Sequence, residues 1–183
     1  LLTLSAMVVS AALLILSLGV FSGMFEDMLS SATEQYHGHM VLAHRDYHLR
    51  RDMYAHLPQN ITEQLQMSNE PQIMGASPRV RSFGLLSVSE HSQPVELLGI
   101  LPDKERQVTS LHTRLVAGRY PNSEDNEVAV IGQGLARKLG LEIGDELVFV
   151  TQAADGSIGN GLLYVSGIFA TGDSRQDNNL VLA

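Results

Sequence analysis

The sequence predicts an α+β protein, with one long apolar helix at the N-terminus followed by a unit of many short strands and few helices. Residues 1–25 contain no charged residue, so all 32 formal charges of the 183-residue chain fall in the remaining 158 residues. After that segment, short apolar runs alternate with turn residues, a pattern typical of strands and short helices. No internal repeat or flexible linker divides this second part, which favours a single mixed α+β unit.

The composition excludes several kinds of site and partner. The chain has no cysteine, so it forms no disulfide, no thiolate metal site and no cysteine nucleophile. Its 20 acidic against 12 basic residues give a net charge of −8. That balance argues against nucleic acid as a partner, because phosphate backbones are bound by basic faces. The mean hydropathy of +0.05 averages an apolar segment with a charged one.

Residues 1–25 are expected to form a transmembrane helix. A helix of that length measures about 37 Å at 1.5 Å per residue, and the hydrocarbon core of a bilayer is about 30 Å thick. Its few polar side chains are hydroxyls, which bond back to helix carbonyls. Two alternatives stay open. One is a signal peptide cleaved after Gly19, although no basic segment precedes the apolar run; the other is a buried core helix.

The helix is expected to continue beyond the membrane as a stalk over residues 26–38. Apolar residues recur at the i, i+3, i+4 and i+7 positions of one helix face, which we interpret as a coupling face: Phe25, Met28, Leu29 and Ala32. Gly38 is the expected end of the stalk, because glycine readily adopts the left-handed conformation that terminates helices.

The next part of the chain is predicted to hold one strand, one loop, one helix and a hairpin. A strand is expected at 39–44, and a polar loop or irregular helical stretch follows at 45–60. Asn60 with Glu63 forms a capping-box pattern that predicts a helix ending near Pro71. Residues 72–101 contain two apolar runs around a polar turn at 90–94, which indicates a β-hairpin.

The C-terminal part is expected to alternate short strands with turns and one clear helix. The predicted elements, in chain order, are a turn or one helical turn at 102–106, an acidic turn at 122–126, strands at 127–131, 146–150 and 162–170, a short helix at 132–139, a turn at 154–157 and an apolar element at 180–183.

The spacing of leucine and glycine residues between 127 and 150 predicts a strand, a short helix, a tight turn and a second strand. Leu135 and Leu139 are expected to anchor the short helix, and Gly140 to end it. Gly144 and Asp145 are expected to make the tight turn into the next strand. These residues are predicted to build the fold rather than to carry chemistry.

The histidines are the most obvious candidates for a metal site, because five of them fall within twenty residues: His37, His39, His44, His48 and His56. Their spacing matches no metalloprotease or zinc-finger pattern, and arginines lie among them. A polar, solvated loop is therefore the preferred interpretation. The sequence contains no serine elbow, no catalytic carboxylate pair and no phosphate-binding loop, so no catalytic residue, metal or cofactor is predicted.

Residues 118–177 resemble the extracytoplasmic domain of ABC permeases of the MacB/FtsX-like superfamily, which includes the macrolide exporter and the lipoprotein-releasing permeases. The order of elements along the whole chain fits the same resemblance. The residues that support it are Gly118, Arg119, Tyr120, Gly132, Leu135, Ala136, Leu139, Gly140, Leu141, Gly144, Asp145, Val165, Ser166, Gly167, Ile168, Phe169, Gly172 and Asp177.

The resemblance implies a specific domain order. It places a transmembrane helix at 1–25 and a stalk at 26–38, followed by the first part of a porter-like α/β lobe at 39–84. A small α/β-rich lobe is then inserted at 85–172, and the porter-like lobe resumes at 173–183. Family architecture would add three further membrane helices, which are not in this sequence.

The resemblance also implies a function and partners. The chain is expected to be a permease subunit and not an enzyme, working in a homo- or heterodimer with a cytoplasmic ABC ATPase in the bacterial inner membrane. Its soluble part would lie in the periplasm and act in lipoprotein release or in the export of a hydrophobic substrate. Membrane lipid and a periplasmic lipoprotein or adaptor are further expected partners, with contacts in the loops 45–56 and 103–126.

Two other functions stay open at this stage. A membrane-anchored sensor shares the span and the stalk, but it would continue into a kinase or chemotaxis module rather than into further membrane helices. A secreted hydrolase would be cleaved after Gly19 and would need a pocket with a perturbed titratable group.

Overall fold

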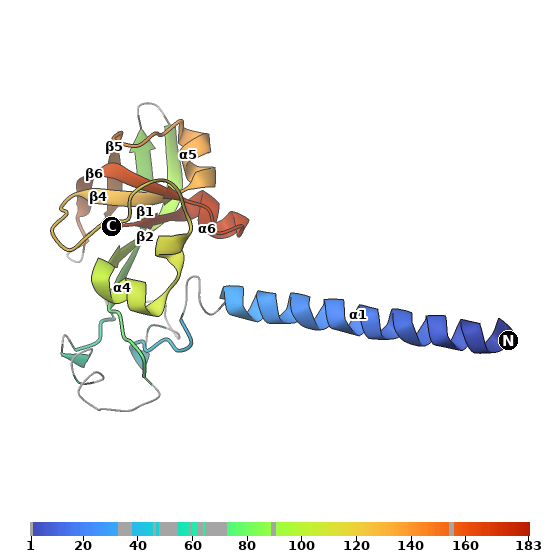
Figure 1. Cartoon of the computed structure of the whole chain (residues 1–183). Coiled ribbons are helices and arrows are strands. Elements are labelled where there is room, and N and C mark those ends of the chain that lie inside the picture. Colours follow the sequence, from blue (N-terminus) through green and yellow to red (C-terminus); the bar gives the residue numbers. More distant parts are fainter. Residues whose placement is uncertain are drawn as a thin grey trace. The chain divides into compact units, whose positions relative to one another are not determined.

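The computed structural model describes residues 2–32, 38–45, 47, 55–58, 60, 61, 64, 73–88, 91–153 and 156–183. The chain forms two compact units, residues 1–40 and 41–183. The first contains helix α1 (Leu2–Ala32), and the second contains a strongly curved sheet with short helices (Figure 1). This mixture of helix and sheet confirms the predicted α+β class.

Helix α1 is long and apolar enough to cross a membrane. Its segment Thr3–Glu26 has a mean hydropathy of 2.4. The helix continues without a break to Ala32. Residues 33–37 of the predicted stalk lie outside the described residues.

The sheet closes on itself into a six-stranded ring. The hairpin β1 (Arg79–Val88) and β2 (His91–Ile100) pairs through β2 with β7 (Leu180–Leu182), and β7 pairs with β4 (Val128–Gly132). The ring continues from β4 to β6 (Ile158–Phe169), from β6 to β5 (Glu146–Gln152), and from β5 back to β1. Closure removes the exposed edges that an open sheet would present.

A seventh strand, β3 (Leu115–Gly118), lies outside the ring. It pairs with the C-terminal half of β6, on the same edge that β5 occupies along the N-terminal half. Strand β6 is 12 residues long. Because it is so long, β6 pairs with β5 along its N-terminal half and with β3 and β4 along its C-terminal half.

The hydrophobic core fills the ring and includes one face of helix α5 (Gln133–Leu139). Side chains alternate between the two faces of each strand, as the pleat requires, and β4 and β7 are buried on both faces. The buried cluster consists of Leu86, Val95, Ala129, Ile131, Leu135, Ala136, Leu141, Leu147, Phe149, Val165 and Val181.

Two further short helices flank the sheet, and Figure 1 shows α5 and α6 beside each other. Helix α4 (Pro102–Val108) follows β2 directly and begins with proline at its first position, which favours helix initiation. Helix α6 (Ser174–Asn179) was not predicted. Its N-cap Asp173 accepts a hydrogen bond from the Arg175 amide at 2.8 Å. With Gln176 three residues on, the sequence already carried a capping-box pattern there.

Two local predictions were wrong. Residues 39–44 form no strand; they are irregular, and the side chains of Met40, Val41 and Leu42 are more than half exposed. An apolar run indicates a tendency to be buried, but a strand also needs a neighbouring edge to pair with. The residues 40–43 make no ladder with any strand of the described chain.

The hairpin turn is shorter than predicted, because β2 already begins at His91 and therefore includes Pro94. Pro94 stands opposite Leu85 of β1, whereas β7 pairs only with residues 96–98 of β2. Position 94 is therefore on a free edge, where the missing N–H of proline costs no ladder hydrogen bond. The predicted loop at 45–60 and the helix after Asn60 lie largely outside the described residues.

Candidate functional site

The predicted coupling face of α1 is the first candidate site. Phe25 and Met28 are more than half exposed, and Leu29 and Ala32 belong to the same unbroken helix. The side chains of Leu29 and Ala32 lie outside the described part of the structure. An α-helix satisfies its backbone hydrogen bonds internally, so a helix of this kind is able to pass from lipid into water without a break.

A second candidate is an apolar patch on the outside of the ring, which we call the outer apolar face. Strand pairing places Leu85 opposite Val150, and Val148 opposite Leu162. Cross-strand partners lie on the same side of a sheet, and Leu86, Leu147 and Phe149 face the core instead. The face consists of Phe83, Leu85, Val148, Val150, Leu162 and Tyr164.

The outer apolar face is substantially open to solvent. Phe83 is 51% exposed and Leu85 49%, while Tyr164 is 40% and Leu162 36% exposed. Single exposed apolar residues are ordinary on protein surfaces, but a contiguous apolar patch on a folded domain is typical of a contact surface. Three adjacent strands present these side chains on one side of the sheet, where Ser87, Glu146 and Asn160 also lie.

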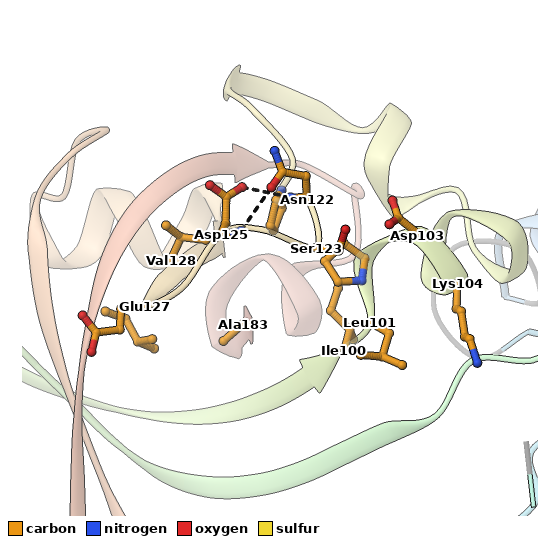
Figure 2. A pocket seen from close by; sticks show the side chains of 13 residues that line it. Ile100, Leu101, Asp103, Lys104, Asn122, Ser123, Asp125, Glu127, Val128 and Ala183 are labelled. Atoms are coloured by element: carbon orange, nitrogen blue, oxygen red, sulfur yellow. Dashed lines mark hydrogen bonds between the residues drawn. The ribbon is translucent and has the colours of Figure 1, made fainter. Parts of the chain in front are cut away.

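A groove of about 410 Å³ opens at the end of the ring where β7 stops, and Figure 2 shows its lining. The walls come from the end of β2 and the start of α4 on one side, and from the loop before β4 on the other. Apolar lining residues are Ile100, Leu101, Pro102, Pro121, Val128, Leu163 and Ala183. Carboxylates of Asp103, Asp125 and Glu127 lie among them, against one lysine, Lys104.

The loop beside the groove is held by one bidentate ion pair. The two terminal guanidinium nitrogens of Arg119, Nη1 and Nη2, donate to the Asp125 carboxylate at 2.5 and 2.7 Å. The Asn122 amide also donates to the Asp125 carboxylate, at 2.9 Å. The hydrogen bonds from Arg119, followed by that from the Asn122 backbone, lower the pKa of Asp125 to about 2. Asp125 is therefore ionised at neutral pH and already engaged within its own loop.

A buried polar cluster lies under α4. The Glu105 side chain is fully buried and accepts hydrogen bonds from Arg79 (2.6 and 3.1 Å), Ser77 (2.8 Å) and Thr109 (2.9 Å). Tyr120 is buried nearby, and burial together with the charge of Glu105 raises its pKa. Arg106 covers the Tyr120 ring at 5.3 Å from its centroid. The cluster offers no open site, since it is filled by its own partners.

The residues predicted to build the fold form one connected set around α5 and β6: Gly132, Leu135, Leu139, Gly140, Gly144, Asp145 and Gly167. Leu135 is buried and Leu139 packs against the same core. Gly140 ends α5 with φ of 67°, in the left-handed region.

The turn after α5 is tied to β6. Gly144 has φ of 93°, and its amide donates to the Val165 carbonyl at 2.8 Å. The Asp145 carboxylate accepts from the Glu142 amide at 2.8 Å. A Cβ on Gly167 would lie 2.6 Å from the Arg119 carbonyl oxygen, so the strand approaches the 118–120 segment too closely for a side chain. These contacts are structural and contain no reactive group.

The histidines do not converge in the part of the chain that the structure describes. No three His, Asp or Glu side chains there group closely enough to hold a metal ion. His37 and His48 lie outside that part, as does most of the predicted contact loop at 45–56. The other predicted contact loop, 103–126, includes α4 and one wall of the groove.

Sequence reasoning missed the outer apolar face and the burial of Glu105. A signal for the first was present, because residues 147–150 (Leu-Val-Phe-Val) are apolar at every position rather than at alternate ones. Nothing in the sequence marked Glu105, since the partner that neutralises it is Arg79, 26 residues earlier.

Comparison with known proteins places the chain in a family. The family described as "MacB-like periplasmic core domain" matches residues 1–183. Curated relatives include the lipoprotein-releasing system transmembrane protein LolC of Xylella fastidiosa strain Temecula1, which is 30% identical over 119 residues. LolC of Neisseria meningitidis serogroup B is 29% identical over 120 residues. Both matches cover 62% of this chain and 29% of the relative, so the chain spans less than a third of their length.

Two solved structures are similar to part of the chain. The extracellular domain of the noncanonic ABC-type transporter YknZ from Gram-positive bacteria has 14% identity and a TM-score of 0.49, covering 67% of this chain and 61% of that one. A permease protein domain from Porphyromonas gingivalis has 18% identity and a TM-score of 0.43, covering 67% and 54%. With the family match over its whole length, the chain belongs to the MacB-like periplasmic core domain family of MacB/FtsX-type ABC permeases.

Proposed function

We propose that this chain is the first membrane-spanning helix, the stalk and the extracytoplasmic domain of a bacterial inner-membrane permease subunit. ATP hydrolysis would belong to a separate cytoplasmic ABC ATPase, and the permease would act as a homo- or heterodimer. The observation that carries the proposal is the continuity of α1, in which a membrane-length apolar segment, Thr3–Glu26, continues as helix to Ala32. Such a helix is suited to relay movement, because it bends little along its axis.

The substrate we propose is a lipoprotein or another hydrophobic export. Two observations support this. The curated relatives are named as transmembrane proteins of a lipoprotein-releasing system. The domain itself exposes the outer apolar face, which is the kind of surface that receives an apolar partner. A periplasmic lipoprotein or an adaptor would meet the domain on that face.

The division of the soluble part into lobes stays a prediction. Its first boundary, between residues 84 and 85, falls within β1, and its last segment, 173–183, contributes α6 and β7. Because β7 pairs with both β2 and β4, this last segment is part of the same ring as the proposed insertion.

Co-purification from membranes tests the proposed function. The complete gene product, carrying an affinity tag, is expected to bring down an ABC ATPase in detergent at a fixed stoichiometry, and its N-terminal segment is expected to remain uncleaved by mass spectrometry. A kinase or chemotaxis partner in place of an ATPase would favour the sensor function instead. Cleavage after Gly19 with release of the domain would contradict both membrane functions.

A further inference from the structure

The Glu105 cluster joins two places that are far apart in the sequence. Glu105 lies in α4, shortly after β2, whereas Arg79 is the first residue of β1 and Ser77 lies two residues before it, 26 and 28 residues earlier than Glu105. Both carboxylate oxygens are used, since Oε1 accepts from Arg79 Nη2 and Thr109 Oγ1, and Oε2 accepts from Arg79 Nε and Ser77 Oγ. We call this set, Ser77, Arg79, Glu105 and Thr109, the Glu105 clasp.

The clasp lies at the open end of the β1–β2 hairpin. Arg79 is the first residue of β1 and pairs with Ile100, the last residue of β2. The other end of the hairpin is closed by its turn, between Val88 and His91. Helix α4 begins two residues after Ile100, the last residue of β2. Glu105 of α4 therefore reaches back to β1 and connects the two strands at the open end of the hairpin.

The segment that enters the hairpin runs along the same helix. A Cβ on Gly75 would lie 3.2 Å from the Cβ of Gln107, so residue 75 is in close contact with α4. The segment that leads into the sheet therefore reaches β1 only after passing α4. Ser77 and Arg79 bind Glu105 at that point.

We infer that the Glu105 clasp is a mechanical lock that holds β1 to β2 at the open end of the hairpin when load reaches β1 from the chain before it. The inference rests on the proposed function, in which the stalk transmits movement. A pull on the residues before Arg79 would otherwise separate β1 from β2 one residue pair at a time, beginning with Arg79 and Ile100. With the clasp closed, the load passes to α4 and the hairpin moves as one body.

The chemistry of the clasp fits a lock better than an ordinary surface ion pair. The Glu105 side chain is 0% exposed and that of Arg79 is 15% exposed. In such surroundings a charge that loses its partner is strongly penalised, so the pair opens as a unit or not at all. The hairpin carries a second ion pair, Arg81–Glu96 at 2.8 Å, whose side chains are 31% and 24% exposed. That pair is the matched control.

Hydrogen–deuterium exchange on the complete permease in nanodiscs tests the lock. Glu105→Gln keeps the size of the side chain but turns an amide NH2 toward the donors of Arg79. We expect the amides that bond β1 to β2 at this end, those of Val80, Ser82, Leu97 and Gly99, to exchange at least tenfold faster, with those of β4 and the C-terminal half of β6 unchanged. Glu96→Gln is expected to change the same amides less than twofold, since water replaces a half-exposed partner.

Two outcomes would overturn the lock: unchanged exchange in Glu105→Gln, or a rise of equal size in Glu96→Gln. If Glu105→Gln exchanges faster everywhere because it fails to fold, Thr109→Val decides. It removes one of the four hydrogen bonds, and the lock predicts about threefold faster exchange confined to the open end. Faster exchange spread over β4 and β6 in that variant also overturns the lock.

A transport measurement then separates the lock from the proposed function. In the permease reconstituted with its ATPase, Glu105→Gln is expected to reduce the substrate moved per ATP at least fivefold, while the ATPase rate stays within twofold. If the wild-type permease binds no ATPase, the proposed function fails, whereas the exchange result still decides whether the hairpin end is locked. An unchanged transport ratio in Glu105→Gln contradicts the lock alone.

Discussion

Gly132 lies so close to α6 that a Cβ at position 132 would stand 2.3 Å from the carbonyl oxygen of Asp177. Its neighbour Gly134 is equally crowded, by the side chain of Asn178. The two glycines at the start of α5 therefore let α5 and α6 approach each other. The loop before α6 is also bound to this helix, because the amides of Thr171 and Gly172 donate to the Asp177 carboxylate at 2.8 and 3.2 Å.

Gly132→Ala is expected to lower the free energy of unfolding by about 1–3 kcal/mol, because the added methyl group must push α6 away from the sheet. Urea unfolding of the chain in detergent, followed by circular dichroism of the sheet, measures the change. Gly161→Ala is the control, since nothing lies within 4 Å of a Cβ at that strand position. A loss of similar size in both variants would show that close approach to α6 is not the cause.

Gly144→Val is expected to destabilise the domain by about 1–3 kcal/mol through its backbone alone. The position has φ of 93°, and no atom lies within 4 Å of a Cβ added there, so the strain comes from the backbone rather than from crowding of the Cβ. Gly144→Asn is expected to cost less, because asparagine tolerates positive φ better than a β-branched residue. Equal melting temperatures for Val, Asn and the wild type would contradict the assigned turn.

The Arg119–Asp125 pair predicts a dependence of stability on pH. The pKa of Asp125 is lowered to about 2 in the folded protein, from an ordinary value near 3.8. The stabilisation that ionised Asp125 gives the folded protein is therefore fully present above about pH 4, and it is lost as the pH falls toward 2. We expect the stability difference between wild type and Asp125→Asn to shrink over that range. Glu124→Gln, in the same turn, serves as control; a constant difference from about pH 5 to 2 would contradict the assignment.

The outer apolar face is expected to contribute to contact more than to folding. Leu85 and Leu162 are 49% and 36% exposed, so replacing both by serine removes partly buried apolar area and is expected to lower the free energy of unfolding by about 2–3 kcal/mol in total. Transport by the complete permease is expected to drop severalfold. Leu86→Ser, one position away and fully buried, is expected to unfold the domain. Full transport by the double variant would exclude the face as the contact surface.

Local patterns in the sequence predicted most elements but not their partners. The strand at 127–131, the helix at 132–139 and its end at Gly140 follow from spacing within a few residues, and all three are present. Closure of the ring depends on the pairing of β1 with β5, whose residues are more than 60 positions apart. No periodicity within one strand encodes such a pairing.

The failed and missing predictions have the same physical origin. Residues 39–44 are apolar but have no strand to pair with in the described chain, so composition alone indicated the wrong element. Glu105 reads as a surface residue of a charged helix, and its burial depends on Arg79 being brought beside it by the hairpin. The long apolar helix was predictable over the part that the structure describes, to Ala32, because its signal lies in its own residues.

Substrate moved per ATP hydrolysed, measured on the complete permease reconstituted with its ATPase, tests the continuity of α1 most directly. Met28→Pro removes a backbone hydrogen bond and kinks the helix just beyond the apolar segment, whereas Met28→Leu preserves it. We expect at least a tenfold lower ratio for the proline variant, with ATP hydrolysis retained and the leucine variant unchanged. A proline variant that moves substrate with the wild-type ratio would contradict a continuous helix as the coupling element.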